Sequence, residues 1–298
     1  MVVATGFFDG VHLGHRYVLE QLVSAARERG TDSCVVTFWP HPRNVLQKDA
    51  RDLRLLTSLA EKSGLIKNMG VDRVEVIPFT QEFSGLSTDR YLNEIVIERL
   101  GGTAILLGYD NRIGCDAGSP DEIAEIASSL GLEVIRADKI DEGDVAVSST
   151  RIRSALSSGD VAAANRLLGY DYCIHGVVVA GNGLGRKLGF PTANVRLYEP
   201  LKAIPARGVY CVSVEALGRR YAGMCNIGVR PTLGDNNAPT IEVNILDFSR
   251  DIYGLDVKVS FLCRLRDEIR FSSLDELAGQ LGRDREATRK FVSEMNFQ

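Results

Sequence analysis

The first half of the chain alternates between two apolar rhythms. Short apolar runs have the length of buried strands at Val2–Thr5, Cys34–Phe38, Val74–Ile77, Ala104–Leu107 and Glu133–Arg136. Between these runs, apolar residues recur at helical spacing. Two of the helical stretches open with capping signals, Ser58 with Glu61 and Ser119-Pro120 with Glu122. This alternation predicts an α/β domain with a doubly wound parallel sheet.

After Gly169 the strand-like runs lie closer together, with few helical stretches between them. They are Cys173–Ala180, Val209–Ala216, Tyr221–Asn226, Ile241–Leu246 and Val257–Leu262, with a hairpin turn expected at Gly218-Arg219-Arg220. Helical patterns follow at Leu274–Leu281 and about Arg285–Met295. We expect a small antiparallel β-barrel with C-terminal helices. The join falls within two short helical segments, and we expect domains of residues 1–157 and 158–298.

Composition narrows the class of protein. The chain has 298 residues, 45% apolar and 25% charged, and a net charge of −4, which argues against a nucleic-acid-binding surface. No apolar run reaches the length of a membrane-spanning helix, and we expect no signal peptide. The six cysteines include no CxxC pair, which indicates reduced thiols and not a disulfide framework or a zinc site. We therefore expect a cytoplasmic protein that neither binds nucleic acid nor crosses a membrane; its oligomeric state is not indicated.

Two histidines, His12 and His15, stand around Gly14 directly after the first apolar run and before a helical pattern. They fall on a strand-to-helix turn at the carboxyl end of a strand, where open α/β sheets bind ligands. Free N–H groups at a helix N-terminus attract anions, and imidazoles there can hydrogen-bond phosphate oxygens. A bare pair of histidines is more often a surface feature, but the strand before and the helix after favour a phosphate site.

A second polar cluster, Ser148-Ser149-Thr150-Arg151-Ile152-Arg153, opens a helix. Hydroxyls at a helix start and a guanidinium fork suit a polyphosphate, with Ser149, Thr150 and Arg153 as the candidate donors. Alone, such a stretch is more often a capped surface helix. Its occurrence in the same α/β domain as His12 and His15 favours the functional interpretation.

The glycine-rich stretch from Gly181 to Asn194 suggests a second phosphate site. Its backbone amides could wrap a phosphate, although the spacing is not that of a P-loop. Thr192 and Asn194 offer uncharged oxygens suited to Mg²⁺, whereas a hairpin without function is the alternative. Further on, strand alternation puts Glu242 on the same face as Asn244. Taken alone, Glu242 would be an exposed strand glutamate.

Five motifs of the first half, GFFDGVHLGH, TFWPHP, LLTSLAEKSGL, FSGLSTDRYL and SSTRIR, resemble in order the FMN adenylyltransferase module of bacterial bifunctional riboflavin kinase/FAD synthetases. The first contains the HxGH signature of the nucleotidyltransferase superfamily. The resemblance implies that the phosphate of FMN attacks the α-phosphorus of ATP and that pyrophosphate leaves. His12 and His15 would stabilise the phosphorus centre, and Ser149, Thr150 and Arg153 would hold the departing phosphates. It further implies ATP contacts at Gly6, Phe8 and Asp110 and a flavin contact at Asn111.

The second half resembles the riboflavin kinase domain of the same family. The resemblance rests on the motifs GRKLGFPTAN, GVY, NIGVRPT, IEVN, LRDEIRF and LDEL. It implies that Thr192 and Asn194 hold Mg²⁺ and ATP, and that Glu242 is the general base for the riboflavin 5′-hydroxyl. The other residues that it implies are Gly185, Arg186 and Lys187 for ATP, and Arg230, Thr232, Arg266 and Phe271 for the flavin.

The chain departs from the family pattern in its first half. Phe7 replaces a usual asparagine, and Asn111 and Ile113 replace two usual aromatic residues. These changes leave open a riboflavin kinase whose nucleotidyltransferase domain is silenced or repurposed. A flavin-binding regulator without catalysis is a second alternative, which the presence of Thr192, Asn194 and Glu242 disfavours.

Overall fold

The computed structural model of the chain describes residues 1–46, 53–108, 112–116, 118–138, 147–181, 183–229 and 239–295, apart from the side chains of Leu184 and Lys187. These residues form two compact units, Met1–Ser149 and Thr150–Gln298. The division falls within the helix α6 (Ser149–Ser158), directly after its first residue. The functional domain boundary between residues 157 and 158 stays a prediction.

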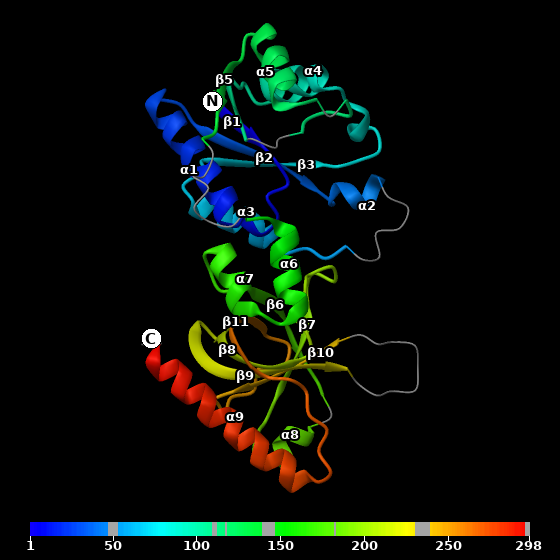
Figure 1. Cartoon of the computed structure of the whole chain (residues 1–298), viewed down its shortest axis with the longest axis vertical. Helices are drawn as coiled ribbons and strands as arrows, with labels where there is room; N and C mark the ends of the chain where they lie inside the picture. The colour runs from blue at the N-terminus through cyan, green and yellow to red at the C-terminus, as the bar shows by residue number, and fades with distance from the viewer. Residues whose placement is uncertain are drawn as a thin grey trace. The chain divides into compact units, whose positions relative to one another are not determined.

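The first unit is built on a parallel sheet of five strands in the order β3-β2-β1-β4-β5 (Figure 1). The strands are β1 (Val2–Thr5), β2 (Ser33–Trp39), β3 (Arg73–Pro78), β4 (Ala104–Leu107) and β5 (Glu133–Arg136). All four neighbouring pairs are parallel, which confirms the doubly wound sheet. The order reverses at β1, because β2 and β4 lie on its two sides. Ligands of open α/β sheets bind at such a switch point, so the residues that follow β1 stand where a site is expected.

Helices cover both faces of this sheet. The helices α1 (Leu13–Glu28) and α3 (Leu59–Asn68) pack on the face to which Val2 and Ala4 point, and α5 (Pro120–Ser129) and the π-helical η3 (Tyr91–Arg99) pack on the face of Val3. Alternate residues of β1 therefore serve two separate cores. The predicted capping boxes of α3 and α5 are both present. The remaining short elements are η1 (Asp9–Val11), α2 (Pro42–Leu46), η2 (Phe83–Gly85) and α4 (Thr88–Arg90).

The second unit contains a closed barrel with the strand order β10-β7-β6-β11-β8-β9 (Figure 1). Every pair around it is antiparallel, which confirms the predicted barrel. Its strands are β6 (Cys173–Val179), β7 (Ala193–Leu197), β8 (Gly208–Ala216), β9 (Arg219–Val229), β10 (Pro239–Ile245) and β11 (Asp256–Arg266). Helices α6, α7 (Val161–Leu168) and α8 (Leu184–Lys187) precede or interrupt the barrel, and α9 (Leu274–Glu294) follows it.

Three sequence expectations for this unit were wrong in detail. The strand β7 was not predicted, because it is short and follows a glycine- and proline-rich stretch. The β8–β9 hairpin turns at Leu217 and Gly218, which both have positive φ, and Arg219, the first residue of β9, already pairs with Ala216 of β8. The two predicted C-terminal helices are one helix, α9, because the glycine at position 282 is tolerated inside a helix at a cost of about 1 kcal/mol.

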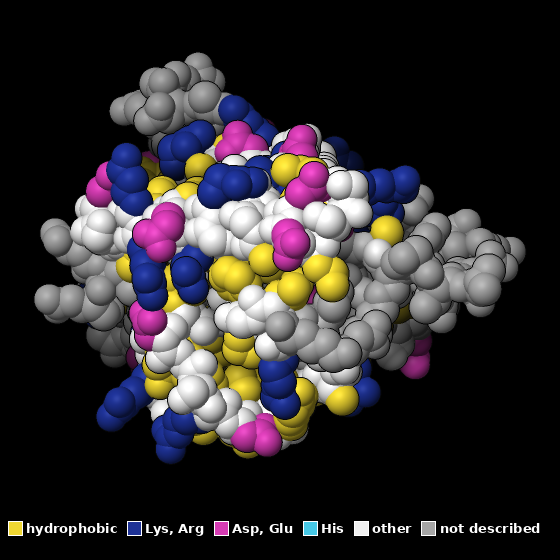
Figure 2. All heavy atoms as spheres, turned by 90° about the horizontal axis from the view of Figure 1, so that it is seen from below, with side chains coloured by type: hydrophobic (Ala, Val, Ile, Leu, Met, Phe, Trp, Pro, Cys, Tyr) yellow, Lys and Arg dark blue, Asp and Glu magenta, His cyan; other side chains and the backbone are white. Residues whose placement is uncertain are grey.

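The described part of the chain has no helix that is long and apolar enough to span a membrane. The six cysteines, which all lie among the described residues, are not joined in disulfides. Cys34, Cys211 and Cys225 are buried, and Cys115 is exposed. Figure 2 shows one face of the surface, on which apolar side chains gather between lysines, arginines and acidic residues.

Candidate active sites

The turn after β1 has an unusual backbone. Phe8 and Val11 adopt positive φ values of 53° and 37°, a region that bulky and β-branched side chains rarely occupy. The carboxylate of Asp9 restrains the turn, because it accepts hydrogen bonds from the amides of Leu56 and Thr57 at 3.0 and 3.1 Å. Strain of this kind persists only where the surroundings over-determine the backbone, and it is concentrated at functional sites.

Two glycines shape the turn for the side chains that it carries. A Cβ on Gly6 would meet the Phe8 ring at 2.9 Å, and a Cβ on Gly14 would lie 3.3 Å from the His12 ring. The Phe8 side chain is buried in the apolar core and touches the His15 ring edge to face, with centroids 5.2 Å apart. Gly14 therefore lets His12 fold across the start of α1, which gives the HxGH spacing a structural reason.

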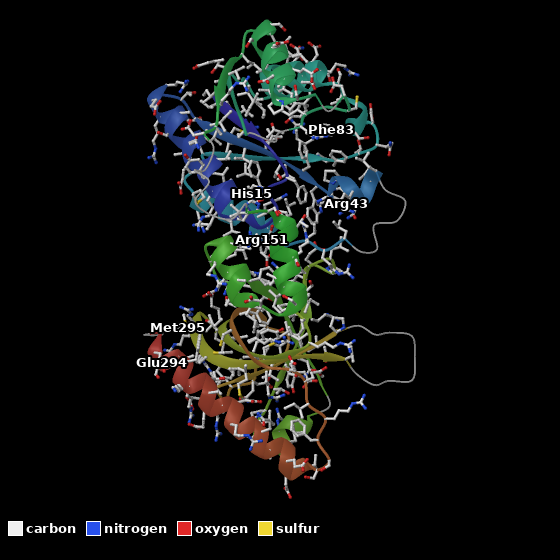
Figure 3. The ribbon with its side chains drawn as sticks, viewed as in Figure 1. His15, Arg43, Phe83, Arg151, Glu294 and Met295 are labelled. Carbon is white, nitrogen blue, oxygen red and sulfur yellow. The ribbon has the colours of Figure 1, made fainter. Side chains whose placement is uncertain are left out.

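His12 and His15 come together as the sequence predicted. The His15 backbone N–H donates to Nδ1 of His12 over 3.3 Å, so His12 caps the N-terminus of α1. A neutral His12 then carries its proton on Nε2. The two rings stack at 3.6 Å between centroids. His15 lies at the first turn of α1 (Figure 3), and its Nδ1 is buried without a hydrogen-bond partner among the described residues.

The surroundings keep His15 neutral. Burial lowers its pKa well below the ordinary value of 6.5, and the nearby His12 and Lys62 lower it further. A neutral imidazole at a helix N-terminus can donate to an incoming anion, and an anion would in turn favour its protonation. This pair of rings is suited to a phosphate whose charge increases during reaction.

Lys62 is a buried cation beneath the same turn. Only 1% of the residue is exposed, its Nζ donates to the Phe7 carbonyl oxygen at 2.8 Å, and the ammonium lies 3.7 Å from the centroid of the Phe7 ring. Burial lowers its pKa to about 7, which Asp9 partly opposes. The Phe7 ring also meets the His41 ring edge to face, with centroids 4.2 Å apart. Sequence reasoning assigned Lys62 no role.

The other predicted residues of the first site are placed only in part. The hydroxyl of Ser149 donates to the carbonyl oxygen of Asp9 at 3.0 Å, which ties the start of α6 to the turn. Thr150 and Arg153 follow Ser149 in α6 and belong to the second unit. Asp110 and Asn111 lie outside the described residues.

A cavity of about 280 Å³ lies in the second unit. Five of the predicted residues line it: Gly185, Thr192, Glu242, Arg266 and Phe271. The remaining lining is Leu188, Phe190, Val209, Met224, Asn226, Asn244, Glu268, Ile269, Leu277 and Leu281. The barrel therefore brings a carboxylate, a hydroxyl and a guanidinium from distant parts of the sequence into one mainly apolar space, as small-molecule sites do.

Glu242 sits in the middle of a polar row across three strands. It pairs with Asn194 of β7 on one side and with Asn226 of β9 on the other. Residues directly opposite each other in antiparallel strands have Cβ atoms about 4.5–5.5 Å apart, so the three side chains are within reach of a common ligand. The barrel register thus joins the predicted base, Glu242, to the predicted metal ligand, Asn194.

The groups around this row are held in position. The amide Nδ2 of Asn244 donates to the carbonyl oxygen of Pro191 at 2.7 Å, which fixes the segment that leads to Thr192. A Cβ on Gly181 would lie 2.0 Å from Nδ2 of Asn194, so Gly181 leaves the space that the Asn194 amide fills. Asn194 is itself buried. Oxygens held this way form a preorganised set of polar groups.

Some predicted residues of the second site do not reach the cavity or cannot be placed. Arg186 is exposed on α8 and does not line it. Arg230 and Thr232 lie outside the described residues, as does the side chain of Lys187.

Each of the two parts of the chain matches a known protein family. The FAD synthetase family matches residues 1–151, and the riboflavin kinase family matches residues 168–292. A bifunctional riboflavin kinase/FMN adenylyltransferase of Listeria monocytogenes is 38% identical over 99% of this chain and 93% of its own length. The chain belongs to this bifunctional family.

Other members of the bifunctional riboflavin kinase/FMN adenylyltransferase family cover the chain equally well. The Bacillus subtilis protein is 37% identical over 99% of this chain and 93% of its own length, and the Escherichia coli K12 protein is 36% identical over 97% and 92%. A crystal structure titled as a macrolide-efflux protein from Streptococcus pneumoniae is 35% identical, with a TM-score of 0.89 over 97% of this chain and 93% of that one. That description applies to the Streptococcus pneumoniae protein.

Sequence reasoning missed several residues of the two family sites. Lys62 carried no signal, because a lysine in a helical pattern reads as solvent-exposed. Asn226 and Asn244 lie within the motifs NIGVRPT and IEVN. The strand alternation, which puts Asn244 on the same face as Glu242, could have identified Asn244 as a site residue. Leu277 and Leu281 of α9 gave only an amphipathic pattern, which does not say what the helix packs against.

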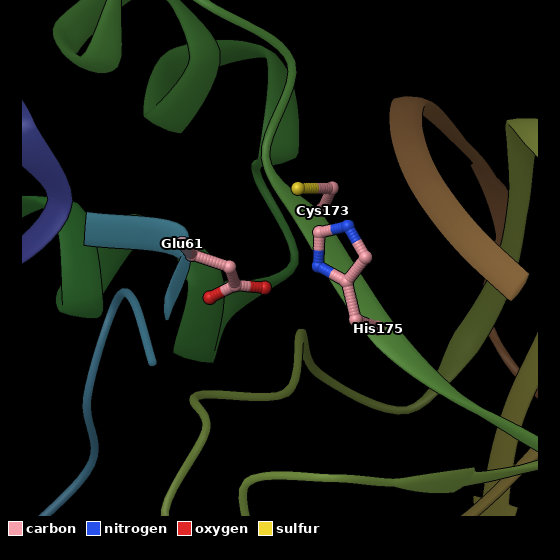
Figure 4. Close-up of side chains that lie close together, drawn as sticks. All are labelled: Glu61, Cys173 and His175. Carbon is pink, nitrogen blue, oxygen red and sulfur yellow. The ribbon is translucent and has the colours of Figure 1, made fainter. Parts of the chain in front are cut away.

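Cys173 and His175 project from β6, two residues apart (Figure 4). Glu61, drawn with them, belongs to the other unit and accepts a hydrogen bond from the Ser58 amide at 2.7 Å. Two side chains from one unit fall short of the three or four protein ligands of a zinc site, and we assign no metal centre to them.

Proposed function

We propose that this protein makes FAD from riboflavin in two steps, each in its own functional domain. Residues 158–298 phosphorylate riboflavin to FMN with ATP, and residues 1–157 join FMN to the adenylyl group of ATP. The observation that carries the proposal is the position of Glu242. It lies in a cavity with Thr192 and directly opposite Asn194, a base beside a set of uncharged phosphate and cation ligands.

In the kinase step Glu242 accepts the proton of the riboflavin 5′-hydroxyl. The hydroxyl oxygen forms a bond to the γ-phosphorus of ATP, the bond from that phosphorus to the bridging oxygen breaks, and ADP leaves. A carboxylate within reach of a primary alcohol contributes about 10²–10⁴-fold to such a transfer. Gly185 and the neighbouring Arg186 and Lys187 are proposed to bind the ATP phosphates.

Thr192 and Asn194 would hold the Mg²⁺ of this reaction. Their hydroxyl and amide oxygens are the hard oxygen ligands that Mg²⁺ prefers when phosphates and water complete its shell. When bound, the ion neutralises phosphate charge. The flavin is proposed to contact Arg266 and Phe271 in the cavity, together with Arg230 and Thr232.

In the adenylyl transfer a phosphate oxygen of FMN attacks the α-phosphorus of ATP, and pyrophosphate leaves. Nε2–H of His12 and a ring nitrogen of His15 donate to the oxygens of the crowded phosphorus centre. No covalent intermediate is needed, because positioning and charge stabilisation are sufficient. Ser149, Thr150 and Arg153 are proposed to hold the departing phosphates.

The remaining assignments of the first unit follow the same proposal. Gly6, Phe8 and Asp110 would contact ATP, and Asn111 would contact the flavin. For Phe8 the contact would come from its backbone, because its ring is buried in the core. We also propose that the functional domains are residues 1–157 and 158–298, that the protein acts in the cytoplasm, and that its substrates are riboflavin, FMN and ATP.

The test is chromatography of the flavins formed when the purified full chain is incubated with riboflavin, ATP and Mg²⁺. FMN that appears first and is then converted to FAD supports the whole proposal. FMN without FAD, also when FMN is added directly, would favour a silenced or repurposed first unit, which the replacements at Asn111 and Ile113 motivate. Riboflavin that binds but is never converted would overturn both activities and leave a flavin-binding regulator.

A further inference from the structure

Arg266, at the end of β11, is the one described cation among the residues that line the cavity. It is paired with Asp284 of α9, whose side chain is 4% exposed. The guanidinium uses Nε on both carboxylate oxygens at 3.0 Å and Nη2 on one of them at 2.8 Å.

Further contacts hold this pair on both sides. The amide Nε2 of Gln280, one helical turn before Asp284, donates to its carboxylate at 2.7 Å. Nη1 of Arg266 donates to the carbonyl oxygen of Asp267 at 2.9 Å. A guanidinium has five N–H groups, and these contacts take three of them in fixed directions. Two N–H groups remain for a ligand, and Arg266 itself lines the cavity.

The ion pair with Asp284 determines which kind of ligand group the two remaining N–H groups of Arg266 can bind. An arginine bound to a buried aspartate is a neutral pair, so it gives little net attraction to a phosphate but still donates hydrogen bonds. Its surroundings are apolar: the Phe271 ring lies 6.0 Å from the guanidinium, and Leu277 and Leu281 of α9 complete the wall. A flat, uncharged ring system with carbonyl oxygens on its edge fits this environment better than a polyphosphate does.

We propose that Asp284 is a positioning residue for riboflavin binding, which holds Arg266 so that its guanidinium donates to the carbonyl edge of the flavin ring. The inference rests on the proposed kinase function of the second unit. It extends the site to α9, since Gln280, Asp284 and the two leucines belong to that helix.

The experiment compares Asp284→Asn with the unchanged full chain in the conversion of riboflavin to FMN. A hydrogen bond to a charged group contributes about 1.5–3 kcal/mol, so we expect the KM for riboflavin to rise about tenfold or more while the KM for ATP changes little. A matched control is Asp247→Asn. It breaks the exposed ion pair between Asp247 and Arg289, and Arg289 lies on α9 as Asp284 does. It should leave both KM values unchanged.

A double variant separates positioning from stability. Breaking a buried ion pair destabilises a protein, whereas replacing both partners by apolar residues of similar size often does not. Arg266→Met with Asp284→Leu should therefore unfold at the temperature of the unchanged protein and still bind riboflavin at least tenfold more weakly in fluorescence titration. Riboflavin affinity restored along with stability would overturn the inference.

Failure of the inference and failure of the proposed function give different results. If the unchanged protein never forms FMN, the kinase proposal itself is wrong. If the protein is active but Asp284→Asn leaves the riboflavin KM unchanged, or raises the KM for ATP instead, only the positioning role of Asp284 is wrong.

Discussion

The imidazole rings of His12 and His15 lie stacked, 14° from parallel and 3.6 Å apart between centroids, at the start of α1. Two imidazolium ions could not share this position without strong repulsion, and burial already lowers the pKa of His15. The free protein therefore holds the pair with at most one charge. The negative charge of a bound polyphosphate favours protonation of the pair, and the two rings can then donate hydrogen bonds to it.

Replacing His12 with asparagine should stop FAD synthesis and spare the fold. Asparagine is as good a helix N-cap as the best residues, so it can keep the cap of α1 while it removes the imidazole donor. We expect FAD formation from FMN to fall at least about 100-fold, which is the effect of losing one donor to a transition state. Formation of FMN from riboflavin by the same preparation is the control. FAD formation at the original rate would show that His12 takes no part in the transfer.

Replacing Glu242 with glutamine should slow the formation of FMN and leave the formation of FAD unchanged. Glutamine keeps the size of the side chain and its place between Asn194 and Asn226, but it cannot accept the substrate proton. The rate of FMN formation should fall about 10²–10⁴-fold. FAD formation from added FMN should be unchanged, and it reports that the chain is intact. A kinase rate within threefold of the original would exclude Glu242 as the base.

A single methyl group on Gly181 should damage the kinase site without unfolding the barrel. The new Cβ would lie 2.0 Å from Nδ2 of Asn194, so the amide must move, and a flexible side-chain end moves at little cost in stability. Because misplacing a reacting group by about 1 Å can cost about 100-fold in rate, we expect a loss of about 10–100-fold in FMN formation.

The matched control for this variant is Gly282→Ala in α9, where an added Cβ meets open space. That change should leave the rate unaltered and raise the unfolding temperature slightly, since alanine is the better helix former. Equal rates for the two alanine variants would mean that the position of the Asn194 amide is not important for the reaction.

Lys62 should make the first unit more stable as the pH rises above neutrality. Its folded pKa of about 7 lies below the ordinary value of 10.5, so between these values the unfolded chain binds more protons than the folded one. The free energy of unfolding then increases with pH, by about 2 kcal/mol between pH 7 and 9. Below pH 7 the penalty for the buried charge is fully present.

The single tryptophan, Trp39 at the end of β2, allows this to be measured in the first unit of the full chain. Urea unfolding followed by its fluorescence should show the gain in the unchanged protein and not in Lys62→Met. The same slope in both proteins would place the titrating group elsewhere.

Local patterns in the sequence determined much of what this protein is. Strand and helix alternation, the two capping boxes and the HxGH turn each depend on residues within a few positions of one another. Short-range backbone preferences and hydrogen bonds are sufficient to produce them, so the sheet, the barrel and the family resemblance could be predicted.

The tertiary structure decided which distant groups meet. The Lys62 ammonium under Phe7, the Asn194 amide opposite Glu242 and the Asp284 carboxylate on Arg266 join residues far apart in sequence. No periodic signal marks such partners, because strand register and helix packing are set by closing the sheet and the barrel around their cores. The sequence by itself could name the reacting groups, and only the fold could assign the residues that hold them in place.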